Sequence, residues 1–205
     1  MTKKTKDKII FTAESLLESN EYKDISIREV AFLSGISIGT FYRYMNSKEE
    51  LLEQLKIKFD QKVYNTLLKQ TKGKNPIEKI LIFFDTYINY ITKYNYKFFV
   101  FFIPTLLEKQ DFISQSKNLC LLKQYIEEAY ESDGFNDIYS QDYIFRTLSS
   151  FFIGTIFNWC FSMGKSDMKK DFFSNFDTLI SKFKNWILSR IILYNKIWFL
   201  SYIIA

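Results

Sequence analysis

Apolar residues recur at helical spacing along almost the whole chain, and no run alternates convincingly with a period of two. Glycine and proline, which favour tight turns, number only 6 and 2 among 205 residues. Long uninterrupted helices are therefore expected. The sequence predicts an all-α fold of about nine helices.

The composition excludes several kinds of chemistry. The chain has no histidine, which removes the commonest general base, the Ser-His and Cys-His nucleophile pairs, and most zinc sites. No cofactor or metal is predicted, and the chain is not expected to be an enzyme. Its two cysteines, Cys120 and Cys160, lie in apolar helical stretches, where both are interpreted as buried thiols in a reducing compartment.

The two ends of the chain give no sign of export or membrane insertion. The basic N-terminus is not followed by a sustained apolar stretch, so it is not interpreted as a signal peptide. The apolar run from Trp186 to Ala205 is interrupted by Arg190 and Lys196, which favours a terminal helix packed on a partner over a membrane span. A cytoplasmic protein is expected.

Three closely spaced helix starts follow a first helix expected over residues 5–19. Ser26 and Glu29 have the spacing of a capping box, and Gly35 permits the positive φ at which the next helix ends. Ser37 is the expected cap of a short helix over residues 38–44. A second capping box at Ser47–Glu50 begins a long helix. This order is typical of a helix-turn-helix with one helix before it and one after.

The clearest break in the chain is the sequence from Lys72 to Pro76, where Asn75 and Pro76 suit the cap and first position of a new helix. Beyond it, helices are expected over residues 76–93, 112–132 and 141–163, with one from Tyr96 that breaks near Pro104. A last helix is expected from Met168 to at least Tyr194. The predicted domains are a helix-turn-helix DNA-binding domain at 1–50 and a helical ligand-binding and dimerisation domain at 51–205.

The second helix of a helix-turn-helix lies in the major groove of DNA, where its early residues reach base edges. Phe41 is expected to turn inward onto Leu16, Val30 and Leu51, which leaves Thr40, Arg43 and Tyr44 pointing outward. Gly39 lets the backbone approach DNA closely. Lys48 lies in the first turn of the following helix, where free amides and a cation together attract a phosphate.

The sequence here resembles the tetracycline-repressor (TetR) family. The resemblance rests on the runs Ser26–Ala31, Ser34–Tyr44 and Ser47–Leu52 and on the spacing between their helices. Two positions depart from the family pattern. Glu21 stands where the family usually has a glycine, and Met45 stands where it usually has an aromatic residue, although methionine can fill the same space.

The resemblance implies a homodimeric repressor of a palindromic operator in double-stranded DNA, with its dimer interface formed by the final two helices. By resemblance, Tyr42 and Lys48 contact phosphates, whereas Ile38, Gly39, Thr40 and Tyr44 face the groove. With the basic N-terminal arm and nearby cations added, the predicted DNA-binding residues are Lys4, Arg28, Ser37, Ile38, Gly39, Thr40, Tyr42, Arg43, Tyr44 and Lys48.

Charge supports this interpretation by its placement rather than by its sum. The net charge of the chain is +5. The residues up to Lys48 include eight basic and six acidic side chains, which leaves only +2 there. The alternative is that these charges belong to an ordinary solvated helical face. Neutralisation of phosphates would make DNA binding sensitive to salt.

Aromatic residues are concentrated around the break at Pro104 and on the later helices. Rings between helices line the usual place for a small apolar ligand. In the family, such ligands move the two DNA-binding parts apart. The predicted ligand-binding residues are Phe84, Tyr87, Phe99, Phe102, Phe145 and Phe152. The few acidic residues nearby favour a neutral or lipid-like effector. The alternative is that these rings simply fill the core.

Two apolar stripes near the C-terminus exceed what one chain is expected to bury, which favours a homodimer. The predicted interface residues are Phe152, Ile156, Trp159, Phe176, Leu179, Phe183 and Trp186, with Gly154 allowing close helix approach. The alternative is a core within one chain.

Three rival functions remain open. The first is a helical ligand carrier or interaction module whose helix-turn-helix no longer reads DNA. The second is an enzyme on an apolar substrate. The third keeps DNA binding but makes the protein an activator or a chromosome-organising factor.

Overall fold

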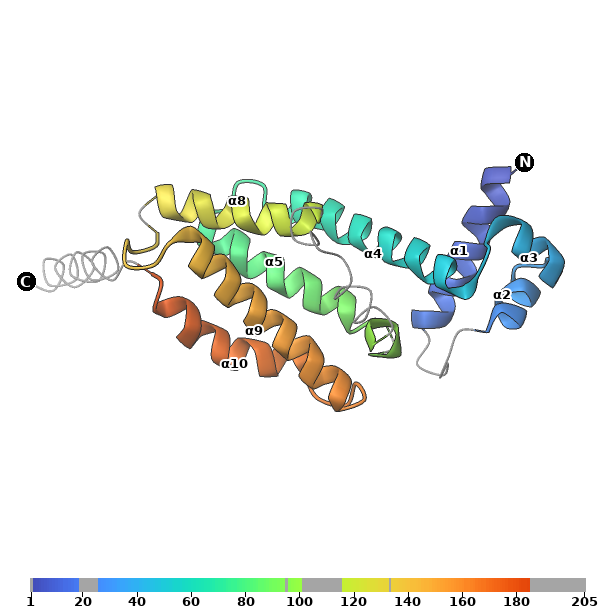
Figure 1. The fold of residues 1–205 in the computed structure, drawn as a ribbon. Helices are drawn as coiled ribbons and strands as arrows, with labels where there is room; N and C mark the ends of the chain where they lie inside the picture. The colour runs from blue at the N-terminus through green and yellow to red at the C-terminus, as the bar shows by residue number, and fades with distance from the viewer. Residues whose placement is uncertain (1, 19–25, 95, 101–115, 133, 185–205) are drawn as a thin grey trace, which may run out of the picture.

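The computed structural model describes residues 2–18, 26–94, 96–100, 116–132 and 134–184 (Figure 1). Its helices are α1 (Thr2–Glu18), α2 (Ile27–Leu33), α3 (Ile38–Tyr44), α4 (Lys48–Gln70), α5 (Pro76–Ile91), α8 (Lys117–Glu131), α9 (Gln141–Phe161) and α10 (Met168–Ser181). Residues 96–100 are also helical. The described residues contain no strand beyond one isolated bridge between Phe135 and Lys184, so the predicted all-α fold is confirmed.

Helices α1, α2 and α3, called the head below, gather at one end of an elongated molecule (Figure 1). Helix α1 packs against α2, α3 and the long helix α4. The head core consists of small and medium side chains around one ring, namely Ile9, Ala13, Leu16, Leu17, Val30, Ala31, Phe41 and Met45. Phe41 turns inward as predicted, and Met45 is fully buried in place of the usual ring.

The body comprises α5, residues 96–100, α8, α9 and α10. Helix α5 lies at its centre and packs against α4, α8 and α10, while α9 packs against α8 and α10. Helix α4 extends from the head along the body (Figure 1). This helix touches both parts, so the boundary predicted at residue 50 stays a prediction.

Local capping signals explain most helix starts. Asn75 Oδ1 accepts from Glu78 N at 2.9 Å, while the Glu78 carboxylate accepts from Asn75 N at 3.2 Å, which completes a capping box. Ser47 Oγ accepts from Glu50 N at 3.2 Å. In the predicted capping box, the Glu50 carboxylate would also accept from the backbone N of Ser47. It accepts instead from the backbone and side-chain nitrogens of Asn46, each at 2.7 Å.

Two sequence predictions about helix ends are wrong. Ser26 is the N-cap residue of α2, but its side chain makes no capping hydrogen bond. The last helix stops at Ser181 rather than continuing to Tyr194. Just beyond that end, the ring of Phe183 is buried against Phe135 and Tyr139, which lie between α8 and α9. The carbonyl of Phe183 accepts from Asn136 N at 2.8 Å in the same connection.

The two cysteines differ in exposure. Cys160 is buried as predicted, and burial raises its thiol pKa to about 11. Cys120 lies on an exposed face of α8, so the prediction of two buried thiols is wrong for this residue. The periodic pattern placed it in a helix correctly but did not identify which face of that helix is covered.

Candidate DNA-binding surface and ligand pocket

Helix α3 is held on the head by its buried side and by its first turn. Gly35, with φ of 63°, turns the chain between α2 and α3. Ser37 Oγ then accepts from Thr40 N at 3.0 Å and lies 2.9 Å from Thr40 Oγ1. Phe41 anchors the inner side of α3 in the head core. These contacts fix the direction in which the remaining α3 side chains point.

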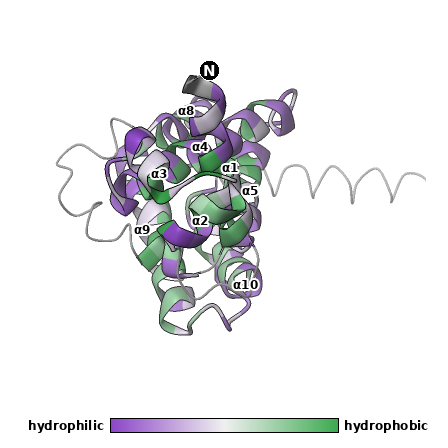
Figure 2. Cartoon of the chain, turned by 90° about the vertical axis from the view of Figure 1, so that its right-hand side faces the viewer, coloured by the Kyte–Doolittle hydropathy of each residue, from purple (hydrophilic) through white to green (hydrophobic). Residues whose placement is uncertain are grey.

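The opposite side of α3 is open to solvent. Figure 2 views the molecule from the head end, with α2 and α3 toward the viewer. Of the predicted DNA-binding residues, the exposed ones are Lys4, Arg28, Ser37, Ile38, Gly39, Tyr42 and Arg43, and the half-buried ones are Thr40, Tyr44 and Lys48. Ile38 and Tyr42 are large side chains exposed by 43% and 50%, which marks this side as accessible.

The start of α4 lies beside this surface. Lys48 is its first residue, and Ser47 caps the helix. Glu50, two residues on, forms an ion pair with Lys6 of α1 at 3.6 Å. Hydrogen bonds from Asn46 hold the pKa of Glu50 below its usual value, so this carboxylate stays ionised near neutral pH. The amide-rich turn at Lys48 is thus tied to α1 by a charged contact.

Sequence reasoning missed two exposed apolar residues close to this surface. Phe32 and Leu33 of α2 are 80% and 49% exposed, although large apolar side chains usually face the core. Their positions follow Val30 and Ala31, which are buried, and a helical count from those two would have placed Phe32 outward.

Residues 9–55 match the family model of bacterial regulatory proteins of the tetR family. The match spans the C-terminal half of α1, the helix-turn-helix and the start of α4. Over these residues the chain is similar to the DNA-binding part of TetR-family regulators. This result confirms the resemblance drawn from the sequence motifs. A search of curated proteins with the sequence finds no match.

Solved structures of transcriptional regulators share the fold over 85–86% of this chain. A TetR transcription regulator from Haloarcula marismortui is 13% identical, with a TM-score of 0.67 over 85% of this chain and 96% of that one. FadR from Bacillus subtilis, solved with stearoyl-CoA, is 17% identical, with a TM-score of 0.59 over 86% and 98% of the two chains. FadR from Thermus thermophilus, solved with lauroyl-CoA, is 20% identical, with a TM-score of 0.54 over 86% and 94%.

In the body, Phe84 and Tyr87, two of the rings predicted to bind a ligand, both pack on a third, Phe152. Phe84 lies with its ring centroid 5.2 Å from Phe152 and 5.1 Å from Phe172. Tyr87 contacts Phe59 of α4 at 6.2 Å and Phe83 at 5.0 Å. Phe84, Phe145 and Phe152 are buried, Tyr87 and Phe99 are half-buried, and Phe102 lies outside the described residues.

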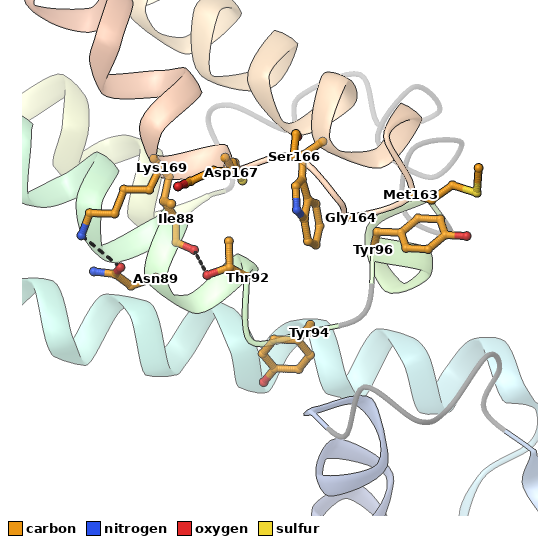
Figure 3. A pocket seen from close by; sticks show the side chains of 12 residues that line it. Ile88, Asn89, Thr92, Tyr94, Tyr96, Met163, Gly164, Ser166, Asp167 and Lys169 are labelled. Carbon is orange, nitrogen blue, oxygen red and sulfur yellow. Dashed lines mark hydrogen bonds between the residues drawn. The ribbon is translucent and has the colours of Figure 1, made fainter.

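A pocket of about 550 Å³ lies elsewhere in the body, where α5 and α9 end and α10 begins (Figure 3). It is lined by Ile88, Asn89, Thr92, Tyr94, Tyr96, Trp159, Met163, Gly164, Ser166, Asp167, Met168 and Lys169. None of the predicted ligand-binding residues is in this set. The pocket is made by helix ends and turns, which helical periodicity does not identify.

The predicted dimer residues are also largely buried inside one chain. Phe152, Trp159, Phe176 and Phe183 are no more than 7% exposed, so they do not form an open surface. Ile156 and Leu179 are half-buried, and Trp186 lies outside the described residues. The exposed side of α9 is formed instead by the α9 stripe of Ile153, Gly154, Phe157 and Phe161, where Phe157 is half-buried.

A buried carboxylate joins the head to the body. Glu14 of α1 is only 4% exposed and lies 2.7 Å from both Lys58 Nζ and Lys62 Nζ of α4. Tyr94, which follows α5, donates its hydroxyl to Glu14 Oε1 at 2.8 Å. Burial alone would raise the pKa of Glu14, but the hydrogen bonds from Lys58, Lys62 and Tyr94 outweigh it and hold that pKa below its usual value.

No group of three potential metal ligands occurs within the parts of the chain that the structure describes. No helix in those same parts is long and apolar enough to cross a membrane.

Proposed function

We propose that this protein is a DNA-binding transcriptional regulator, a repressor that a small, mainly apolar ligand releases from its operator. The observation that supports this most strongly is the exposed side of α3, which carries Thr40, Arg43 and Tyr44 within the segment that matches the TetR model. A short capped helix of this kind fits the major groove, and Arg43 is long enough to reach a guanine edge or a phosphate.

The same protein would bind as a homodimer, because a palindromic operator repeats its half-sites about 34–36 Å apart. The α9 stripe is the surface that we propose for this contact. Ile153 and Phe161 are 49% and 77% exposed. A Cβ atom added at Gly154 would have no neighbouring atom of the chain within 4 Å, so the backbone there is open. A second copy of α9 could therefore approach closely at Gly154.

A lipid-like effector with an apolar part is supported by two features. The body is rich in buried rings, and two proteins of similar fold were solved with lauroyl-CoA and stearoyl-CoA. An effector would act by binding more tightly to the state in which the heads are misplaced for DNA, since a ligand shifts an equilibrium only by its differential affinity.

DNA binding is tested by fluorescence anisotropy of the purified protein on a labelled duplex from upstream of its own gene, at two salt concentrations. We expect tight binding that resists scrambled competitor DNA and weakens as salt rises. Equal and weak binding to upstream and scrambled DNA, repeated with duplexes selected from random sequence, would instead favour a ligand carrier with a helix-turn-helix that does not read DNA.

The dimer is tested by sedimentation of the Ile153→Asp variant. A charge on the α9 stripe should convert the dimer to a monomer, because an unpaired buried charge is costly. Ile138→Asp is the matched control, since Ile138 is 79% exposed and lies before α9. A dimer that survives Ile153→Asp unchanged would place the interface elsewhere.

A further inference from the structure

The pocket described above lies at the end of the body that faces the head. Figure 3 shows Tyr94 at its edge, next to α4, with most of the other lining side chains on the opposite side. Tyr96 and Trp159 lie beside Gly164, where an added Cβ would come within 3.5 Å of both rings. Aromatic faces therefore form one wall, and the absence of a side chain at Gly164 leaves space between them.

The charged groups of the pocket are already satisfied by the protein. Lys169 Nζ lies 2.6 Å from Asp85 and 3.4 Å from Asn89 Oδ1. Asp167 accepts from Lys170 N at 3.0 Å as the cap of α10. A charged ligand would have to displace one of these contacts. Asn89, Thr92 and Ser166 add neutral polar groups to the wall; they already bond to Asp85, Ile88 O and Ser162, and their oxygens can each accept a further hydrogen bond.

Tyr94 belongs both to the pocket and to the contact with the head. It is one of the residues that line the pocket, its side chain is only 2% exposed, and its hydroxyl donates to Glu14 of α1 at 2.8 Å. The ring also packs 5.5 Å from Phe59 of α4 and 5.2 Å from Phe98. A ligand that shifts Tyr94 from its edge of the pocket has to move the hydroxyl relative to Glu14, because the ring and its hydroxyl are rigidly joined.

We propose that this pocket is the effector site, that it takes a small uncharged molecule with a planar aromatic body and a hydrogen-bonding end, and that Tyr94 transmits its occupancy to Glu14 in the head. The proposal rests on the proposed function for its biological meaning. Tyr94 acts here as a positioning residue for the head. Ligand binding loosens the contact between α1 and the body, and the heads lose the spacing that an operator requires.

The test uses the full-length protein and prodan, an uncharged naphthalene that carries one ketone. Hydrogen exchange is measured by mass spectrometry with and without prodan. We expect exchange to slow about threefold or more in residues 88–94 and 159–169, and to speed up in α1 around Glu14. In Tyr94→Phe, the pocket should remain protected by prodan while the response of α1 disappears.

Tyr90→Phe is the matched control. The hydroxyl of Tyr90, like that of Tyr94, bonds to another helix: it lies 2.9 Å from Thr66 Oγ1. That bond joins α5 to α4 and does not involve α1. This variant should respond to prodan as the wild-type protein does. A purely structural effect of losing a tyrosine hydroxyl would change both variants alike, and that result would overturn the role of Tyr94.

A second pair of variants tests the site itself. Thr92→Phe places a ring in the pocket and should weaken prodan binding about tenfold or more. Thr147→Phe is its control, because Thr147 bonds to the carbonyl four residues earlier, as Thr92 does, but lies outside the pocket. Unchanged binding in Thr92→Phe, protection centred on Phe84 and Phe152, or no protection by prodan would each overturn the proposal.

DNA anisotropy of the same proteins separates this proposal from the proposed function. If neither the wild type nor any variant binds DNA specifically, the proposed function as a DNA-binding regulator is contradicted. A prodan response in α1 that depends on Tyr94 would still support the effector pocket and the role of Tyr94 in that case. Specific DNA binding combined with an α1 response that persists in Tyr94→Phe would support the regulator and overturn the transmission.

Discussion

The head and the body of this molecule reach a packed core by different means. Among the described residues of the head, Phe41 is the one buried ring, surrounded by aliphatic side chains and Met45. In the body, rings pack on rings across helices that are distant in sequence, as Phe84 of α5 does with Phe152 of α9 and Phe176 of α10. The head core is small and local, whereas the body core is aromatic and shared among several helices.

This difference suits two different tasks. A small core fixed by caps and a glycine turn holds α3 in one position, which groove recognition requires. The body leaves room at the ends of its helices, where the pocket lies. Among the described residues, the two parts meet at α4 and at the contacts of Glu14 with Lys58, Lys62 and Tyr94, so a change in one part can reach the other through these contacts.

The largest expected effects come from removing one ring from each core. Phe41→Ala and Phe172→Ala should each cost about 3–5 kcal/mol, because both side chains are fully buried. Phe41→Ala should loosen the head while the body stays protected, and Phe172→Ala should do the reverse. Hydrogen exchange at each helix is the measurement, and equal loosening of both parts by either variant would contradict two separate cores.

A smaller effect is expected at the junction of the two parts. Glu14→Gln should cost about 2 kcal/mol at pH 7, because it replaces charged hydrogen bonds to Lys58 and Lys62 with neutral ones. The pKa of Glu14 is lowered in the folded protein. Its stabilising contribution is therefore complete above the unfolded pKa of about 4.3 and is lost as the pH falls through the lower folded value.

Urea unfolding at pH 7 and at lower pH checks this expectation. The difference between wild type and Glu14→Gln should shrink on acidification, with Glu127→Gln on the exposed face of α8 as the control. A difference that stays constant with pH would mean that the charge of Glu14 does not hold the junction together.

The smallest effects concern helix caps. Asn75→Ala in the body should cost about 1 kcal/mol, because it removes a complete capping box from α5. Ser26→Ala in the head should cost only a few tenths of a kcal/mol, since the Ser26 side chain makes no capping hydrogen bond. Thermal unfolding of both variants measures the contrast, and equal losses would show that Ser26 caps α2 in solution.

The sequence predicted the head more accurately than the body for a physical reason. Helix starts at Ser37 and Ser47, the turn at Gly35 and the inward direction of Phe41 all follow from local periodicity and capping. The TetR motif added the identity of the exposed α3 residues. These features depend on neighbours within a few positions along the chain.

In the body, the same periodicity marked the apolar sides of helices but not what covers them. Phe84 and Phe152 were predicted to line a ligand cavity, and the structure shows their rings packed 5.2 Å apart. Phe183 was predicted to face a partner, and it is buried beside Phe135. Residues such as Tyr94 and Gly164 meet only after the chain has folded, so helical periodicity did not locate the pocket.

The measurement that tests the central claim most directly is DNA affinity of Arg43→Ala and Arg146→Ala, each on upstream and scrambled duplexes. Both arginines are exposed, but Arg43 lies on α3 and Arg146 lies on α9, paired with Asp142. We predict that Arg43→Ala weakens binding to the upstream duplex by about 10- to 100-fold and that Arg146→Ala changes it by less than about twofold. Equal losses in the two variants, or none in Arg43→Ala, would contradict the claim that α3 reads DNA.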